Sequence, residues 1–281
     1  MIKNQIKTVI LLGALTGLLL GAGRLLGGRN GLFIGLAFAL VMNFGSYWYS
    51  DKIVLAMYRA QPVKKSDHPE LYNLVKETSK EANLPMPKVY IVPSNASNAF
   101  AAGRNEKHAA VAVTAGITQL LNKEELKGVI AHELAHIKNR DTLIQAVAAT
   151  IAGVISYLAF FARFAAFFGG GRDRDSGGAF ELLALAILTP LIATILQLAI
   201  SRSREYLADE TGAKTIKNPK ALANALHKLH IGVKHNPLRF GNPSTSSLFI
   251  VNPFSARGLI SLFSTHPPME ERIKRLESLK I

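Results

Sequence analysis

The segment His132-Glu133-Leu134-Ala135-His136 has the residue types and the spacing of a catalytic metal site. Residues four apart on an α-helix lie on the same face, so both imidazoles can bind one zinc ion at about 2.0–2.1 Å. Glu133 lies one position round the helix from His132, close enough to reach a water molecule on that zinc without being a ligand. The H-E-x-x-H pattern therefore predicts a site of the protease type, with Glu133 as the general base.

The flanking residues predict the helix that this site requires. Asn122 and Glu125 have the spacing of a capping box, which begins a helix. Apolar residues then recur at helical spacing, and Lys138 and Arg140 place positive charge at the C-terminal end of the helix dipole. The alternative is a surface helix with two solvated histidines and a solvated glutamate. We expect the metal-binding helix.

A hydrolytic zinc site usually takes three ligands from the protein. A third histidine soon after the motif is excluded, because Asn139 and Thr142 stand where the extended pattern has Gly and His, and the chain has no cysteine. A carboxylate from a second helix remains, and Glu205 is the best candidate. Glu205 and Asp209 are four apart, so one can bind metal while the other accepts a hydrogen bond from a zinc-bound imidazole. Spacing alone leaves open an ordinary charged helix in which Glu205 is solvated.

Four motifs, in this order, resemble those of the HtpX-type membrane zinc metalloproteases, which are bacterial relatives of the CAAX prenyl proteases. The motifs are Asn98-Ala99-Phe100-Ala101-Ala102-Gly103, His132-Glu133-Leu134-Ala135-His136, Glu205-Tyr206-Leu207-Ala208-Asp209 and Thr265-His266-Pro267-Pro268. The arrangement of the apolar segments is also similar. The resemblance therefore covers nearly the whole chain.

The resemblance implies a fold and a role for each of these residues. It implies a mainly α membrane protein that carries a cytoplasmic, α+β, zincin-like metalloprotease domain. One zinc ion per chain would be bound by His132, His136 and Glu205, and Asp209 would be the hydrogen-bond partner of a ligand. His266 would lie near the reaction centre and stabilise the charge on a tetrahedral intermediate. Without the resemblance, His266 would be a cap or a surface residue.

A small antiparallel sheet is predicted beside the metal-binding helix. Residues 88–92 have the pattern of a strand, and residues 98–102 and 109–114 that of a hairpin around a polar turn. The edge of such a sheet can accept an extended polypeptide by strand addition, which binds the main chain and tolerates many sequences. Asn98, Ala99 and Phe100 are therefore assigned to substrate binding. The alternative is that the hairpin only covers the core.

Three further helices are predicted, at residues 67–83, 218–230 and 269–279, and residues 237–258 are predicted to be a long loop that borders the cleft. His227 and His230 are three apart on the second of these helices. Because no third ligand accompanies them, they are interpreted as structural residues and not as a second metal site.

Four stretches of the chain are free of charged residues and mostly apolar, as membrane spans are. The chain is 49% hydrophobic, and its mean hydropathy is positive. A span needs about 20 apolar residues. The stretches are residues 8–23, 31–50, 143–162 and 182–201, and a polar turn at 169–178 separates the last two. The alternatives are a cleaved signal peptide for the first stretch and two core helices of a soluble domain for the last two.

These stretches divide the chain into four parts. Residues 1–50 are an N-terminal transmembrane hairpin, and residues 143–201 are a second pair of transmembrane helices. Residues 51–142, which include the H-E-x-x-H helix, and residues 202–281 are the two parts of the metalloprotease domain. The catalytic domain is therefore expected to be discontinuous in sequence.

The distribution of basic residues predicts the orientation in the membrane. If all four stretches span, 28 of the 33 lysines and arginines lie on one side of the bilayer. By the positive-inside rule, both termini and the zinc site face the cytoplasm, at a bacterial inner membrane. The net charge of +14 then indicates attraction to the anionic lipid bilayer and not to nucleic acid, because no basic run is interleaved with aromatic residues. The absence of cysteine fits a reducing compartment.

The predicted activity is hydrolysis, by zinc-activated water, of peptide bonds in misfolded or membrane proteins at cytoplasmic segments. The resemblance implies a role in membrane-protein quality control and the stress response. Two alternatives stay open at this point: a prenyl-protein protease, and a non-catalytic membrane scaffold that uses zinc for structure. A homo-oligomer and quality-control partner proteins are likewise left open.

Overall fold

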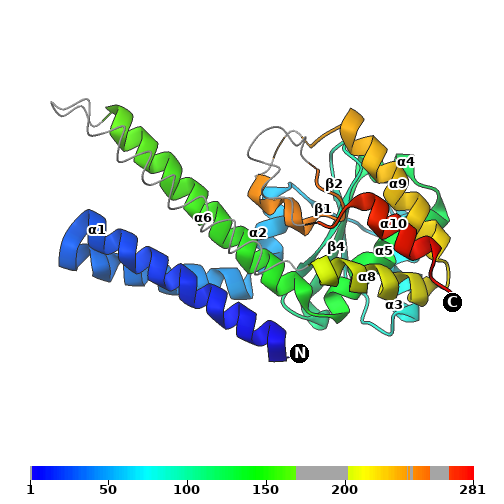
Figure 1. The fold of residues 1–281 in the computed structure, drawn as a ribbon, viewed down its shortest axis with the longest axis horizontal. Coiled ribbons are helices and arrows are strands. Elements are labelled where there is room, and N and C mark those ends of the chain that lie inside the picture. The colour runs from blue at the N-terminus through cyan, green and yellow to red at the C-terminus, as the bar shows by residue number, and fades with distance from the viewer. Residues whose placement is uncertain (1, 169–201, 239, 241–242, 254–265) are drawn as a thin grey trace.

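Long helices leave one side of a mixed α/β unit in this computed structural model (Figure 1). The structure describes residues 2–168, 202–238, 240, 243–253 and 266–281. Two helices, α1 (Ile2–Trp48) and α6 (Asp141–Phe168), extend side by side, and the other described elements form the α/β unit. The fourth predicted span, at residues 182–201, and the polar turn at 169–178 lie outside the described residues.

The first helix, α1, is a hairpin of two helical arms. Its helical backbone is interrupted at Gly27 and Gly28, and Gly28 has a φ of 58°, which glycine adopts without strain. The arms, Gln5–Arg24 and Gly27–Trp48, are each long and apolar enough to cross a membrane. They correspond to the first two predicted spans, and the agreement rests on length and composition.

The helix α6 contains the third predicted span. Its 28 residues, at 1.5 Å each, make it about 42 Å long, which exceeds the hydrocarbon thickness of a bilayer. Its first part, Asp141–Ile155, is apolar and packs against α1 through a shared cluster that includes Ile144 and Ile151. Residues 143–162 therefore lie in one helix, and its crossing of a membrane stays a prediction.

A four-stranded mixed sheet lies at the centre of the α/β unit. Its order is β1-β2-β4-β3, and the strands are β1 (Gln61–Pro62), β2 (Lys88–Val92), β3 (Ala99–Gly103) and β4 (Ala109–Thr114). The predicted hairpin is confirmed, because β3 pairs antiparallel with β4. The prediction of a purely antiparallel sheet is wrong, because β2 runs parallel to β4.

The parallel pair arises because β4 lies between β2 and β3. The chain reverses direction after β2, as it would in a hairpin, but β2 and β3 stand apart and β4 fills the space between them. All six residues of β4 are buried, and most of them are alanine or valine, so both faces of the strand can be covered. The central position of β4 in the sheet depends on packing against both of its faces. The alternation of residue types along the chain does not predict this position.

The remaining helices pack around the sheet. They are α2 (Ser50–Met57), α3 (Pro69–Glu81), α4 (Ala115–Leu120), α5 (Lys123–Lys138), α8 (Arg202–Ile216), α9 (Pro219–His235), α10 (Met269–Glu277) and the short 3-10 helices η1 (Glu106–His108) and η2 (Pro243–Leu248). The helices predicted at residues 67–83, 218–230 and 269–279 are present as α3, α9 and α10, and α9 continues beyond the predicted end. The predicted loop 237–258 contains η2.

The helix α5 is the element on which the others converge. Its predicted capping box is confirmed: the Asn122 side chain accepts a hydrogen bond from the Glu125 N–H, and the Glu125 carboxylate accepts one from the Asn122 N–H, both at 2.9 Å. Further along, α8 crosses α5 so closely that a Cβ added at Gly212 would lie 2.8 Å from the backbone nitrogen of His132. The glycine at 212 therefore sets how near α8 comes to the H-E-x-x-H segment.

The two arms of α1 also approach closely at glycines. A Cβ added at Gly35 would lie 2.5 Å from the Leu19 carbonyl oxygen, whereas a Cβ added at Gly13 would meet nothing within 4 Å. We predict that Gly35→Leu forces the arms apart and lowers the free energy of unfolding by roughly 1–3 kcal/mol, the usual cost of overpacking. Gly13→Leu, the same change on an open face, should alter it by less than about 0.5 kcal/mol. Thermal unfolding in detergent compares the two variants, and equal melting temperatures would contradict the close packing of the hairpin.

Candidate metal centre

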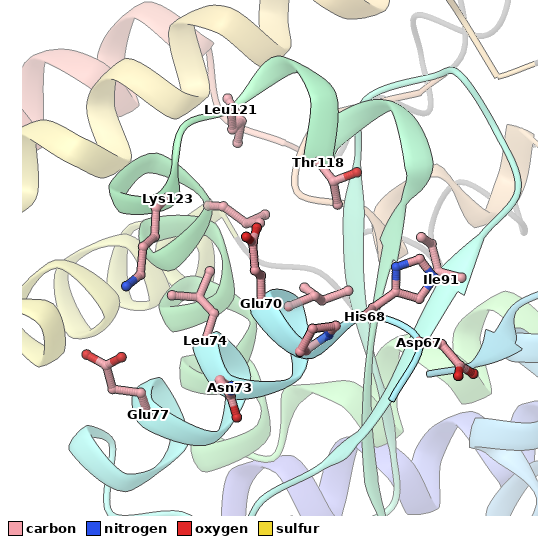
Figure 2. A pocket seen from close by; sticks show the side chains of 13 residues that line it. Asp67, His68, Glu70, Asn73, Leu74, Glu77, Ile91, Thr118, Leu121 and Lys123 are labelled. Atoms are coloured by element: carbon pink, nitrogen blue, oxygen red, sulfur yellow. The ribbon is translucent and has the colours of Figure 1, made fainter. Parts of the chain in front are cut away.

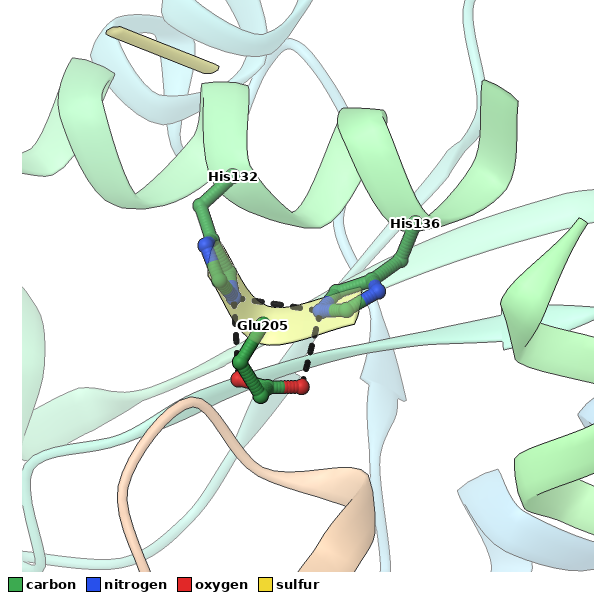
Figure 3. Close-up of side chains that lie close together, drawn as sticks. All are labelled: His132, His136 and Glu205. Atoms are coloured by element: carbon green, nitrogen blue, oxygen red, sulfur yellow. Dashed lines mark hydrogen bonds and ion pairs between the residues drawn. The ribbon is translucent and has the colours of Figure 1, made fainter. Parts of the chain in front are cut away.

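Three side chains from two helices converge on one point in the interior (Figure 3). His132 and His136 come from α5, and Glu205 comes from α8. The two Nε2 atoms lie 3.2 Å apart, His136 Nε2 lies 3.4 Å from Glu205 Oε1, and His132 Nε2 lies 3.8 Å from Glu205 Oε2. All three residues are buried, so the alternative of a surface helix with solvated histidines is wrong.

These separations fit a tetrahedral zinc site. Two ligands at about 2.0–2.1 Å from one ion, at the tetrahedral angle, lie about 3.3–3.4 Å apart. The three observed separations, 3.2, 3.4 and 3.8 Å, are close to that value. The residues could therefore hold the ion with only small adjustments of their side chains.

The hydrogen bonds of the two imidazoles also favour a cation between them. His132 Nδ1 lies 2.9 Å from Asp209 Oδ1, and His136 Nδ1 lies 3.3 Å from Asp141 Oδ2. A carboxylate accepts a hydrogen bond from Nδ1–H, so each neutral ring presents the lone pair of Nε2 to the other ring. Two lone pairs 3.2 Å apart repel unless a cation lies between them. Asp209 thus lies where the sequence places the partner of a ligand.

A proton occupies this position when no metal is bound. Burial lowers the pKa of His136, but the negative charge of Glu205 and the hydrogen bond with Asp141 outweigh it and raise that pKa to about 9. Burial is the main cause that lowers the pKa of His132. The His132 ring therefore stays neutral, and its Nε2 accepts a hydrogen bond from His136 Nε2–H. Metal binding must therefore displace a proton, and the affinity for metal falls as the pH falls.

Glu133 lies beside the three ligand residues and is also buried. Burial raises its pKa to about 7, and the neighbouring charge of Glu205 contributes in the same direction. The backbone of Ala101, in β3, makes a hydrogen bond to the Glu133 carboxylate. A carboxyl group with a pKa near the working pH both accepts and returns a proton readily, which is what a general base requires.

Three residues of this centre are not predicted from the sequence. Arg272, on α10, is fully buried and donates to both oxygens of Asp209, at 2.8 and 2.7 Å. Asp141 contacts His136 Nδ1, and Arg204 lies 3.0 Å from the other oxygen of Asp141. One signal was available: Arg272 lies between Met269 and Leu276 on the apolar face of its helix, where an arginine is out of place unless it is paired.

The segment Phe249-Ile250-Val251 lies along the outer edge of β3, beside the metal centre. Ile250 N–H donates to the Ala99 carbonyl at 3.1 Å, and the Asn98 side chain donates to the Val251 carbonyl at 2.6 Å. Arg272 donates to the Ile250 carbonyl at 2.8 Å. The edge that the sequence assigns to substrate is thus paired with the chain's own residues.

His266 contacts the same segment. Its Nε2 lies 2.6 Å from the Phe249 carbonyl oxygen and 4.0 Å from Glu205 Oε2. Burial is the main effect that lowers the pKa of His266, so the ring is neutral. Because a carbonyl oxygen only accepts, Nε2 carries the proton and donates it. The structure thus places His266 beside the metal centre with a hydrogen-bond donor directed at a backbone carbonyl.

The other histidine pair and a large surface hollow lie away from this chemistry. Among the described residues, His132, His136 and Glu205 are the group with metal-binding geometry, and His227 and His230 are not part of such a group. Figure 2 shows a surface hollow of about 770 Å³ between α3, β2 and the start of α5, lined among others by Glu70, Ile91 and Lys123. None of the metal-centre residues lines it.

Comparison with known proteins agrees with this geometry. Residues 65–280 match the family model described as "Peptidase family M48". The chain belongs to peptidase family M48. It is 56% identical over 280 residues to "Protease HtpX homolog" of Syntrophobacter fumaroxidans. The aligned region covers 98% of this chain and 99% of the relative. The "Protease HtpX homolog" of Pyrococcus furiosus is 53% identical over 275 residues, 98% of this chain and 95% of the relative.

A solved structure supports the fold of this M48 chain. Ste24p of S. mikatae matches it with a TM-score of 0.52 and 19% identity, over 98% of this chain and 66% of Ste24p. At that identity the likeness shows the fold alone. With the sequence relatives, it makes the chain an HtpX-type metallopeptidase of the M48 family, as the resemblance of the motifs implied. The alternative of a non-catalytic scaffold is therefore not supported.

We predict that the M48 metal centre binds one zinc ion per chain and is stabilised by it. Zinc at about 100 times its dissociation constant should raise the free energy of unfolding by about 2.7 kcal/mol, and a chelator should reverse the effect. Glu205→Ala removes one ligand and should abolish most of this gain. Glu210→Ala, an exposed carboxylate on the same helix, is the matched control. Metal analysis and thermal unfolding measure both effects, and a Glu205→Ala protein with full zinc content would refute the ligand set.

Proposed function

We propose that this M48 metallopeptidase is a zinc endopeptidase in which His132, His136 and Glu205 hold the ion and Glu133 is the general base. The observation that carries the proposal is the convergence of three buried ligand atoms, one from each residue, within 4.8 Å of one another, with the Glu133 carboxyl group beside them. Zinc, when bound, supplies Lewis-acid activation of water and of the peptide carbonyl.

Glu133 moves the proton in this proposal. It takes a proton from the attacking water and then delivers it to the leaving nitrogen of the cleaved peptide bond. Burial raises the pKa of Glu133, which makes the carboxylate a better proton acceptor than a solvated one. The backbone of Ala101, in β3, interacts with the carboxylate and partly offsets the rise in its pKa. Asp209 and Asp141 hold the two histidine rings through their Nδ1 atoms.

His266 stabilises the developing negative charge on the substrate carbonyl oxygen. The contact with the Phe249 carbonyl supports this role, because it shows that a backbone carbonyl can reach the Nε2–H while lying close to Glu205. A neutral donor that is already oriented contributes more to a charge that develops during reaction than to the neutral substrate.

The substrate pairs with β3 through Asn98, Ala99 and Phe100, in the place of the segment Phe249-Ile250-Val251. That segment forms an antiparallel bridge to β3 at Phe100 and is hydrogen-bonded to Asn98 and Ala99, as an added substrate strand would be. Both it and the metal centre are buried, so a polypeptide reaches the centre only after the segment moves aside. Recognition through main-chain atoms suits unfolded chains of varied sequence.

The proposed setting is the cytoplasmic face of a bacterial inner membrane, with misfolded and membrane proteins as substrates. The two apolar arms of α1 support membrane attachment, and the N-terminus lies at the same end of the hairpin as the α/β unit (Figure 1). The excess of basic residues in the segments next to the spans supports a cytoplasmic side. Residues 1–50 and 143–201 are proposed as the membrane parts, and residues 51–142 and 202–281 as the two parts of the protease domain. Cleavage of prenylated proteins is the alternative substrate class.

We predict that Glu133→Gln keeps the metal and loses the activity. The amide preserves the size of the side chain but cannot accept the proton, so the rate of casein cleavage by detergent-purified, zinc-loaded enzyme should fall by roughly 10²–10⁴-fold. Glu124→Gln, which changes an exposed carboxylate on the same helix, should leave the rate unchanged. Zinc content is measured on all three proteins, and undiminished cleavage by a zinc-loaded Glu133→Gln enzyme would reject the assignment.

We further predict that tying the segment 249–251 to β3 blocks cleavage. Phe100 in β3 and Phe249 in the neighbouring segment are paired. The hydrogen bond from Ile250 N–H to the Ala99 carbonyl identifies them as a non-hydrogen-bonded pair, and the side chains of such a pair lie close together. The chain has no cysteine, so Phe100→Cys/Phe249→Cys introduces the one pair of thiols in it.

Oxidation of this double variant should reduce casein cleavage at least tenfold, and a reductant should restore it, with zinc content unchanged. Phe249→Cys alone is the control and should not respond to the oxidant. Equal rates for the oxidised and reduced double variant would show that substrate binds without displacing the segment.

A further inference from the structure

A hollow of about 260 Å³ lies where the α1 hairpin meets the α/β unit. Both arms of the hairpin contribute to it, the first through Val9 and Leu12 and the second through Tyr47. Two arginines complete it: Arg104 comes from the turn after β3, and Arg140 comes from the connection between α5 and α6. The catalytic residues take no part in this hollow.

The hollow lies at the end of the hairpin that carries the aromatic residues typical of a membrane interface. The arms run antiparallel, so the start of the first arm at Gln5 and the end of the second at Trp48 lie at the same end. Tyr47, Trp48 and Tyr49 are each more than a third exposed at this level. Tyrosine and tryptophan are enriched where a span leaves the hydrocarbon region.

The two arginines are held at the hollow by specific structure. Arg104 donates to the Trp48 carbonyl oxygen at 3.2 Å, and its guanidinium lies 4.6 Å from the centre of the Trp48 ring. Arg140 has a φ of 57°, a left-handed conformation that is strained for a residue with a side chain. The neighbouring Thr142 hydroxyl donates to the Gly103 carbonyl at 2.7 Å and so ties the two arginine-bearing segments together.

The chemistry of the hollow matches an anionic lipid. Guanidinium groups bind phosphate oxygens through several N–H donors at once, and none of the described residues that line the hollow is acidic. Its apolar side opens onto the face of α1 that carries Ile6, Val9 and Ile10, which are 53%, 68% and 55% exposed. A ligand that suits both sides has a phosphate at one end and hydrocarbon at the other.

We infer that this hollow binds one anionic phospholipid, with the headgroup phosphate between Arg104 and Arg140 and the acyl chains along the exposed face of α1. The inference rests on the membrane attachment given under the proposed function but does not depend on the catalytic assignment. Basic pockets beside membrane helices are a recurring form of headgroup recognition.

Native mass spectrometry of the full chain, released from neutral detergent, tests the site with phosphatidylglycerol, phosphatidylcholine and inorganic phosphate. One phosphatidylglycerol should be retained, and the double variant Arg104→Gln/Arg140→Gln should weaken its retention about tenfold or more. Arg24→Gln/Arg29→Gln is the matched control, because it removes two exposed arginines at the other end of the hairpin, and it should bind as the unmodified chain does.

Three outcomes would overturn the inference: equal retention by the Arg104→Gln/Arg140→Gln variant, equal retention of phosphatidylcholine, or full displacement of the lipid by inorganic phosphate. Zinc content checks that each variant is folded, and Arg140→Gln alone, which keeps the Arg104–Trp48 contact, serves if the double variant is not. Loss of lipid binding with zinc binding intact separates this site from the metal centre, whatever the result for Glu133.

Discussion

The facing Nε2 atoms of His132 and His136, 3.2 Å apart in the interior, are the constraint to which the rest of the centre responds. Four carboxylates surround them, those of Glu133, Asp141, Glu205 and Asp209, but the two guanidiniums among the described residues at the centre, Arg204 and Arg272, balance two of these. Buried charge is costly unless it is compensated. A divalent cation would take the place of the proton that His136 otherwise carries and would remove the repulsion between the nitrogen lone pairs. The excess of buried carboxylates therefore favours a cation between the two imidazoles.

The fold serves this constraint by fixing the distance between α5 and α8. Contact at Gly212 lets the backbone of α8 approach His132, and Glu205, seven residues earlier on α8, then reaches both imidazoles. Arg272 joins α8 to the segment beside β3, because it donates hydrogen bonds both to the Asp209 carboxylate and to the Ile250 carbonyl. A shift of α10 would therefore disturb the orientation of His132 through Asp209, although α10 contributes no ligand. The helix α5 thus forms one site with Glu205, which follows its end by 67 residues, and with Arg272, which lies further along the chain.

Local patterns in the sequence predict what local interactions determine. The capping box at Asn122, the helix that follows it and the hairpin of β3 and β4 depend on residues within a few positions of one another, and all three are present. The parallel pairing of β2 with β4 was missed because it depends on which strand fills a space, and no nearby residue encodes that. Arg272 and Asp141 were missed because their partners are distant in sequence or face into a site that only tertiary packing creates. Glu205 was the best candidate for the third ligand from residue type and spacing, but spacing alone left a solvated, charged helix open, and the resemblance decided between the two.

The strand β3 connects the end of the α1 hairpin near Trp48 with the metal centre. At one end, the turn that follows Gly103 carries Arg104 onto Trp48, and Thr142 ties Gly103 to α6. Only three residues before Arg104, Ala101 bonds Glu133. Three residues of extended chain span about 10 Å. A polypeptide paired with β3, as proposed above, would therefore pass Glu133 about 10 Å from the end of the α1 hairpin near Trp48. In the proposed membrane orientation, this distance suits polypeptide segments that emerge directly from the bilayer.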